Sequence, residues 1–226
     1  MNSPLRFDAR IWTMTVVYTV MLGVLYFSAL SWLVLHDWPR DDYSYAYFIP
    51  LLVAYLIWIK KDQFLQTIST PSWYGLCAFI PGIILYWIGE LSGEFFSLYI
   101  SLWLVMVGLV WMHLGWNKLK IICFSAVFSL FMFPLPNFLN TQVSLKLKLV
   151  SSWLGVWLMQ TYGLSAYREG NTIDLGFTQL QVVDACSGLR YLIPLIILGV
   201  LFAYFYKGTF WKKAALVIST IPLSII

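Results

Sequence analysis

The chain has 226 residues, of which 61% are apolar, 19% are aromatic and only 11% are charged, and its mean hydropathy is +0.79. Soluble domains are about 45–50% apolar and about 25% charged, so this composition excludes a cytosolic globular enzyme, a disordered chain and a nucleic-acid-binding arm. The formal net charge is +4, but the basic residues lie singly or in pairs at the ends of apolar runs and form no patch. The composition therefore predicts a protein that resides in the lipid bilayer.

Apolar runs alternate with short charged segments along the whole chain. A membrane-crossing helix needs about 20 mostly apolar residues, or slightly fewer where neighbouring helices allow it. We expect spans near 11–35, 44–59, 73–89, 95–112, 119–136, 189–206 and 211–226. The first run is too long and too aromatic for a signal peptide, so it is expected to remain as a helix. The expected fold class is an all-α polytopic membrane protein in which residues 1–226 form one transmembrane domain of about seven helices.

The positions of the charged residues predict the orientation in the membrane. With the N-terminus in the cytoplasm, the inner segments carry nine of the fourteen lysines and arginines: Arg6, Arg10, Lys60, Lys61, Lys118, Lys120, Lys207, Lys212 and Lys213. The outer segments then carry eight of the ten acidic residues. Short cytoplasmic loops are typically rich in lysine and arginine, so we expect a cytoplasmic N-terminus.

Residues 137–160 form an amphipathic segment. Its polar positions recur every three or four residues, as on one stripe of a helix: Asn137, Thr141, Ser144, Lys148, Ser151, Ser152 and Gly155. The opposite stripe is apolar: Leu145, Leu149, Trp153, Val156 and Trp157. This helix either spans the membrane or lies in its outer interface. The interfacial position is favoured, because a span here would reverse the orientation of the basic loop around residues 207–213.

Residues 161–185 contain no apolar run of spanning length. Ile173, Leu175 and Phe177 alternate with polar residues, and the alternation then shifts phase before Leu180 and Val182. A turn near residues 176–178 would produce such a shift, so we expect a small β-hairpin there. Together with the amphipathic helix it would form an outer segment over residues 137–188.

The three cysteines are separated by long gaps, which predicts neither a disulfide framework nor a zinc site. Cys77 and Cys123 lie inside apolar runs, where a thiol behaves as a small hydrophobic group. Cys186 instead lies at the boundary between the outer segment and the sixth span. We expect no metal and no other cofactor, because the chain carries no phosphate loop, nucleotide fingerprint or metal-ligand motif.

A helix that begins near Cys186 would activate its thiol in two ways. The positive end of the helix dipole favours the thiolate, and so does Arg190, which follows one turn later on the same face. Asp184 would oppose this effect if it came close, Ser187 is a rival nucleophile without a visible base, and Gly188 leaves bare backbone for an extended substrate. The alternative is structural: Cys186 is a spacer, Arg190 reaches to lipid headgroups and Asp184 caps the helix.

Several stretches together resemble a known family. They occur in this order: Asp41-Asp42-Tyr43-Ser44 with Ile49-Pro50, Pro134-Leu135-Pro136, Glu169-Gly170-Asn171-Thr172-Ile173, and Asp184-Ala185-Cys186-Ser187-Gly188-Leu189-Arg190 followed by an apolar run and Trp211-Lys212-Lys213. They are similar to the first outer loop, the Pro-Leu-Pro turn, the Gly-Asn-x-Ile strand and the central signature of the exosortase/archaeosortase family. The resemblance covers roughly residues 40–226. Members of that family are membrane cysteine transpeptidases that process C-terminal sorting signals.

The resemblance implies a function, a partner and a location. Cys186 would be the nucleophile of a cysteine transpeptidase or protease at the outer face of a bacterial inner membrane. Its substrates would be exported proteins with a short C-terminal motif, a hydrophobic span and a basic tail. Many members have Ser-His-Gly where this chain has Ser44-Tyr45-Ala46. The family's catalytic set also includes an Arg and then a His or second Arg in later helices, and this sequence stops just before the expected Arg, so we expect a fragment.

Two other functions remain open. A non-enzymatic transporter or exopolysaccharide-assembly protein is suggested by the aromatic spans and by the polar stripe of 137–160, although no acidic or basic residue lies well inside a span. A rhomboid-like serine protease lacks support, because the chain has no Gly-x-Ser-x-Gly element. Of the two histidines, His113 is expected at an inner helix end, and His36 lies in the first outer loop, where a catalytic role is a minor possibility.

Overall fold

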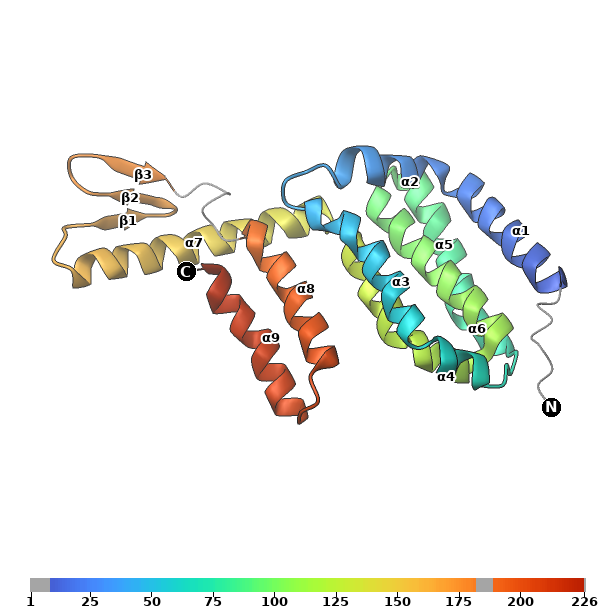
Figure 1. Ribbon diagram of the computed structural model, residues 1–226. Helices are drawn as coiled ribbons and strands as arrows, with labels where there is room; N and C mark the ends of the chain where they lie inside the picture. Colours follow the sequence, from blue (N-terminus) through green and yellow to red (C-terminus); the bar gives the residue numbers. More distant parts are fainter. Residues whose placement is uncertain (1–8, 182–188, 226) are drawn as a thin grey trace. The chain divides into compact units, whose positions relative to one another are not determined.

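The computed structural model describes residues 9–181 and 189–225 (Figure 1). The chain divides into two compact units: the first unit contains residues 1–40 and 46–134, and the second contains residues 41–45 and 135–226. The described regular elements of the first unit are helical, with these bounds: α1 (Ala9–Leu25), α2 (Phe27–Trp32), a π-helical turn (Leu33–Asp37), a 3-10 turn whose first two residues belong to the second unit (Ser44–Phe48), α3 (Ile49–Ile59), α4 (Lys61–Gln66), a 3-10 turn (Trp73–Gly75), α5 (Leu76–Ser92), α6 (Phe95–Phe128) and a final 3-10 turn (Ser129–Met132).

The expected first span, residues 11–35, is not one straight helix. The helical stretches Thr13–Leu25 and Phe27–Asp37 meet at an angle of 72°. The break falls at Tyr26, whose side chain is buried and whose hydroxyl is 2.6 Å from the Ser101 hydroxyl of α6. Ser101 in turn donates to the carbonyl oxygen of Gly82 at 2.7 Å. No proline causes this bend. It occurs where a buried tyrosine joins a polar contact between three helical segments.

Glycines allow α5 and α6 to pack backbone against backbone. Gly75, Gly82 and Gly89 recur every seven residues and are all buried. A Cβ atom at Gly82 would lie 2.8 Å from the Val105 side chain, and one at Gly108 would lie 2.7 Å from the Phe79 nitrogen. Small residues that permit such close approach are typical of helix pairs in membranes, where no hydrophobic effect drives the helices together.

Helix α6 folds back on itself at Gly115. This residue has φ 83° and ψ 171°, outside helical geometry, and a side chain there would collide with the Thr70 carbonyl. The indole nitrogen of Trp103 donates to the Ala126 carbonyl at 2.7 Å, although a straight helix would place these residues about 34 Å apart. The break lies between the expected segments 95–112 and 119–136, so α6 consists of two arms that lie side by side.

By length and composition, two helices among the described residues can cross a membrane: Trp73–Ser92 and Phe95–Met132. The bent pair at residues 13–37 adds a third if it forms one span, while Ser44–Ile59 and Tyr191–Phe205 are shorter apolar helices. The expected count of seven transmembrane helices is therefore not confirmed. The helix boundaries nevertheless follow the predicted apolar runs closely, with the bend at Tyr26 as the main departure.

The second unit contains one long helix, a small sheet and a helix pair. Its elements are α7 (Asn137–Thr161), β1 (Tyr167–Glu169), β2 (Thr172–Asp174), β3 (Gln179–Gln181), α8 (Leu189–Phe205) and α9 (Phe210–Ile225). Helix α8 contains Pro194 and packs along α9, where a Cβ atom at Gly199 would lie 2.8 Å from the Thr220 side chain. Both helices match the residue ranges of the expected segments 189–206 and 211–226, but in their described residues neither qualifies as a candidate membrane span by length and composition.

The sheet has one strand more than the expected hairpin. Its order is β1-β2-β3, and both pairings are antiparallel. The second turn lies where the sequence predicts it: Leu175 donates its N–H to the Thr178 carbonyl at 2.9 Å and Gly176 has φ 82°. The strand that sequence reasoning missed is β1. Its signal is Gly170-Asn171, a dipeptide typical of two-residue hairpin turns.

Candidate active site

Four of the predicted site residues, Asp184, Cys186, Ser187 and Gly188, lie outside the described residues. Arg190 is the second residue of α8, and its side chain also lies outside the described part. The structure therefore describes the elements that lead into and out of the predicted nucleophile region: β3, which ends at Gln181, and α8, which begins at Leu189. These elements and the helix that supports the sheet define the candidate active site as far as the structure describes it.

The sheet is fixed to α7 by hydrogen bonds as well as by apolar packing. Arg168 of β1 donates to the Leu149 carbonyl at 2.9 Å, and the buried Ser152 hydroxyl donates to the Gly170 carbonyl at 3.1 Å. A small cluster of buried residues, Val156, Ala166 and Ile173, fills the space between the helix and the strands. The strand pair β1–β2 is thus held on the helix at its side chains and at its turn.

This arrangement explains why α7 has a polar stripe. Two serines of the expected polar stripe, Ser144 and Ser152, are buried. The Ser152 hydroxyl also forms a hydrogen bond to the sheet. The apolar stripe is mostly exposed, with 50% exposure at Leu145, 57% at Trp153 and 51% at Trp157. Val156 is buried beneath the sheet, and Leu149 is partly buried. The polar stripe is therefore buried at Ser144 and Ser152, whereas Asn137 and Thr141 at the start of the helix are exposed.

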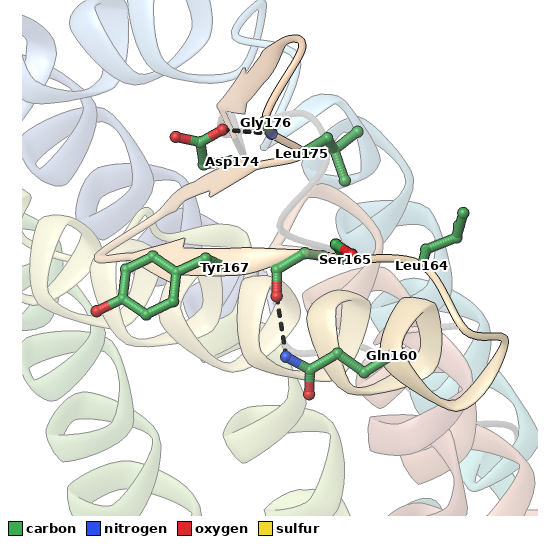
Figure 2. A pocket seen from close by; sticks show the side chains of 8 residues that line it. Gln160, Leu164, Ser165, Tyr167, Asp174, Leu175 and Gly176 are labelled. Carbon is green, nitrogen blue, oxygen red and sulfur yellow. Dashed lines mark hydrogen bonds between the residues drawn. The ribbon is translucent and has the colours of Figure 1, made fainter.

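A shallow hollow of about 370 Å³ lies between the end of α7 and the sheet, and its lining mixes polar residues such as Gln160 and Asp174 with apolar ones such as Leu164 and Leu175 (Figure 2). Two polar groups in it are already engaged. The Gln160 side-chain amide donates to the Ala166 carbonyl at 2.9 Å. The Asp174 carboxylate accepts from the Gly176 N–H at 2.7 Å and from the Gln179 amide at 3.3 Å. Asp174 therefore stabilises the β2–β3 turn.

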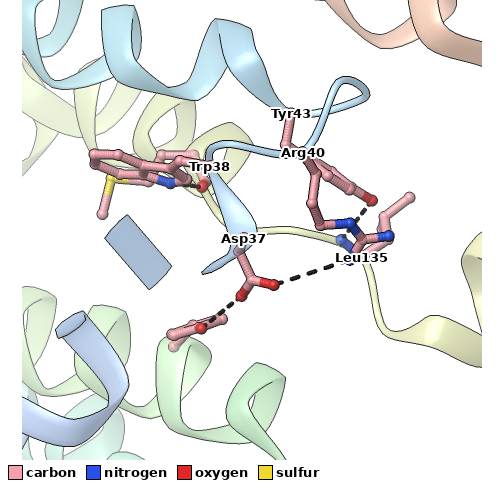
Figure 3. Close-up of polar contacts among 7 residues, drawn as sticks. Asp37, Trp38, Arg40, Tyr43 and Leu135 are labelled. Carbon is pink, nitrogen blue, oxygen red and sulfur yellow. Dashed lines mark hydrogen bonds and ion pairs between the residues drawn. The ribbon is translucent and has the colours of Figure 1, made fainter. Parts of the chain in front are cut away.

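Two of the motif segments in the sequence meet in the second unit. The backbone N–H of Leu135, in the Pro-Leu-Pro segment, donates to the hydroxyl of Tyr43 at 3.3 Å (Figure 3). Tyr43 is buried, and 92 residues separate the two partners in sequence. Leu135 directly precedes Pro136, the residue before α7. The Asp41–Ser44 segment thus anchors the chain where α7 begins.

A polar cluster in the first unit was not predicted. The carboxylate of Asp37 accepts a hydrogen bond of 2.7 Å from the Tyr99 hydroxyl and lies 3.9 Å from the Arg40 guanidinium (Figure 3). Beside it, the Trp38 indole donates to the Met132 carbonyl at 3.0 Å. Asp37 and Tyr99 are 62 residues apart, so the only local signal was an Asp at the end of an apolar run with Arg three residues later.

The structure also describes the other two cysteines and both histidines. Cys77 and Cys123 are free and exposed on the surfaces of α5 and α6. The ring of His36 stacks on Trp32 with centroids 4.0 Å apart. His113 bonds the Tyr18 hydroxyl at 3.1 Å and lies two residues before the break in α6. Within the described part of the chain, no group of three or more His, Cys, Asp or Glu residues could hold a metal ion.

The sequence profile of the family described as Transmembrane exosortase (Exosortase_EpsH) matches residues 37–226. The chain belongs to the exosortase family. No curated protein and no solved structure matches it. The matched range begins at Asp37 and includes Tyr43, the Pro-Leu-Pro segment, the whole sheet and the Cys186 signature. In this exosortase, the matched region thus includes both partners of the Tyr43–Leu135 contact and the complete sheet on α7.

Proposed function

We propose that this exosortase is a membrane-embedded cysteine transpeptidase or protease whose nucleophile is Cys186. The observation that carries the proposal is the family match over residues 37–226, which includes the Asp184–Arg190 signature. Cys186 also has the most suitable position of the three cysteines. It lies between an edge strand and a helix start, whereas Cys77 and Cys123 lie on helix surfaces.

The proposed reaction forms and then breaks an acyl-enzyme. The Cys186 thiolate attacks the scissile carbonyl carbon, the C–N bond breaks, and the leaving amine departs after taking a proton. A second nucleophile, either water or an amine on a cell-surface glycan, then attacks the thioester and returns the sulfur as a thiolate. Arg190 follows Cys186 by four residues in the sequence and is assigned to stabilising the thiolate or positioning the substrate. Asp184, Ser187 and Gly188 are assigned to positioning beside it.

The proposed substrates are exported proteins with a short C-terminal motif, a hydrophobic span and a basic tail. The proposed site of action is the outer face of a bacterial inner membrane, with the enzyme's N-terminus in the cytoplasm. Two of the loops assigned to the cytoplasm do lie together in the first unit, since the Lys118 ammonium is 4.9 Å from the centre of the Phe64 ring. This contact supports the assignment of these two loops to one side of the membrane, as the charge distribution predicts.

We further propose that α7 lies flat in the outer interface of the membrane. Ser152 of its polar stripe is buried and bonds the sheet, and Leu145, Trp153 and Trp157 leave an apolar side exposed. Such a side favours insertion into the boundary between headgroups and acyl chains, where tryptophan is enriched. An interfacial α7 would hold the sheet, and with it the chain leading to Cys186, at the membrane surface.

A processing assay tests the proposed function. The full-length protein is co-expressed with a tagged reporter that carries a C-terminal sorting signal, and the reporter mass is compared between wild type and Cys186→Ala. We expect cleavage by wild type and none by the variant at equal amounts of membrane protein. The matched controls are Cys77→Ala and Cys123→Ala, both of which should retain cleavage. Cleavage by Cys186→Ala would refute the assignment, and failure of both proteins to cleave would favour the transporter hypothesis.

A further inference from the structure

Among the residues that the structure describes, β3 has a strand partner on one edge only, and its other edge is free. The sheet order places β3 beside β2 alone, and its residues Gln179, Leu180 and Gln181 are all exposed. An edge strand presents backbone N–H and C=O groups that another extended chain can pair with. Natural edges are commonly blocked by lysine, proline or a bulge, but β3 consists of two glutamines and a leucine and pairs in simple register.

The alternation of hydrogen-bonded pairs along β2 and β3 identifies which backbone groups of β3 face away from β2. The bond from the Leu175 N–H to the Thr178 carbonyl makes that pair a hydrogen-bonded one. Opposed residues in an antiparallel ladder alternate between hydrogen-bonded and non-hydrogen-bonded pairs. Leu180, opposite Ile173, therefore faces β2 with its backbone, while Gln179 and Gln181 belong to non-hydrogen-bonded pairs. The N–H and C=O groups of both glutamines point away from β2.

The β1–β2 pairing agrees with this alternation. Its two-residue turn, Gly170-Asn171, makes Glu169 and Thr172 a hydrogen-bonded pair, so Thr172 directs its backbone groups to β1. Thr172 then cannot bond Gln181, its partner on the other side. Both turns thus assign the same outward-facing groups. Within the described residues, no backbone hydrogen bond outside the strands involves Gln179 or Gln181.

We propose that this free edge of β3 binds the substrate polypeptide as an added antiparallel or parallel strand. The inference rests on the proposed function. Two donors and two acceptors, repeated at about 7 Å, match the two-residue period of an extended peptide. Gln181 precedes Cys186 by five residues, a reach of at most about 17 Å. A peptide paired with β3 would be held extended, the form in which its scissile carbonyl is accessible to a nucleophile.

A single proline substitution in β3 tests the pairing of this strand with the substrate. Gln181→Pro removes an outward N–H without removing a bond to β2, which is the position where an edge strand tolerates proline. Gln181→Ala removes the same side chain but keeps the N–H. We expect the proline variant to process the reporter about five- to tenfold more slowly than the alanine variant. With a synthetic peptide substrate, this difference should come from a higher KM. Equal rates for the two variants would overturn the proposal.

A second measurement leaves the enzyme unchanged. Synthetic sorting-signal peptides are N-methylated at one backbone position at a time and assayed with the wild-type protein. Strand pairing predicts that inhibition alternates along the peptide, because only every second N–H faces β3. If N-methylation slowed processing equally at every position, or only at the scissile bond, strand pairing would be refuted. This result would count even if Gln181→Pro failed to fold.

The outcomes separate this inference from the proposed function. If Cys186→Ala still cleaves the reporter, the proposed function fails. If Cys186→Ala is inactive but the proline and alanine variants match and N-methylation shows no alternation, only the role of β3 fails. If Gln181→Pro instead lowers the oligomeric size in detergent and leaves KM unchanged, the edge pairs with a second copy of the chain, and the substrate proposal is wrong.

Discussion

Trp103 and Ala126 lie on opposite arms of α6 and are joined by a hydrogen bond of 2.7 Å from the indole nitrogen to the carbonyl oxygen. The same indole nitrogen is 3.2 Å from the Ser129 hydroxyl. Ala126 lies in the last turn of α6, where carbonyls lack α-helical partners, and its carbonyl also accepts from the Ser129 hydroxyl at 2.7 Å. The Trp103–Ala126 contact defines α6 as a helical hairpin and makes the break at Gly115 structurally necessary.

Gly115→Ala should therefore destabilise the first unit. Alanine is strained at φ 83°, and its Cβ would collide with the Thr70 carbonyl. We expect a loss of at least about 2 kcal/mol in the free energy of unfolding, seen as a lower Tm in detergent. Gly23→Ala is the control, because a Cβ there meets no atom within 4 Å. Similar Tm values for the two variants would contradict the hairpin.

Arg168→Met should loosen the sheet from α7. It removes the hydrogen bond to the Leu149 carbonyl, and a bond from a charged donor contributes about 1.5–3 kcal/mol. We expect faster amide hydrogen exchange in β1 and β2 and slower reporter processing, because the strand leading to the nucleophile region loses support. Lys146→Met on the exposed side of α7 removes a charge without such a bond. If both variants exchange alike, Arg168 does not hold the sheet.

Cys186 should react with a thiol-alkylating probe faster than either other cysteine. The thiolate is the reactive form, and the proposed activation of Cys186 by the start of α8 and by Arg190, four residues later in the sequence, would favour it. We compare three variants that each retain one cysteine, at pH 7, and expect Cys186 to react at least about tenfold faster than Cys77 or Cys123. A slower or equal rate at Cys186 would indicate an unactivated thiol and weigh against the enzyme.

Spin labels on the apolar side of α7 should distinguish an interfacial helix from a spanning one. Labels at positions 145 and 157 of a cysteine-free protein would lie at similar shallow depths, about 5–10 Å into the bilayer, if α7 is interfacial. A helix that spans the membrane would separate their depths by up to about 18 Å. Depth is measured by power-saturation contrast between oxygen and a nickel chelate. A difference near the larger value would refute the interfacial position.

Much of the fold follows from the sequence, because apolar runs and charged interruptions determine where helices begin and end in a membrane. The runs near 73–89 and 189–206 correspond to helices with nearly the same ends. The bend at Tyr26 could not be predicted. Tyr26 at the bend contacts Ser101, a partner 75 residues away, and no proline marks the position. The turn dipeptide Gly170-Asn171 could have predicted the strand β1. The strand itself gave no signal, because only one of its three residues is apolar and it shows no alternation.

The candidate site was predicted in part. The family could be recognised from short motifs, because Cys186 and its neighbours form a compact local pattern. The Tyr43–Leu135 contact could not be derived, since nothing in either segment specifies a partner 92 residues distant. The polar stripe of α7 was visible, but its role was not. Only the folded second unit places Ser152 against Gly170.

The Trp103–Ala126 bond also constrains how the chain is made. Twenty-three residues separate donor and acceptor, and ribosomes add about 5–20 residues per second. For about one to five seconds the nascent first arm therefore carries an indole donor whose partners have not yet been synthesised. An unpaired donor is costly in hydrocarbon, so during biosynthesis the first arm should be held beside a polar surface of the insertion machinery until the second arm emerges.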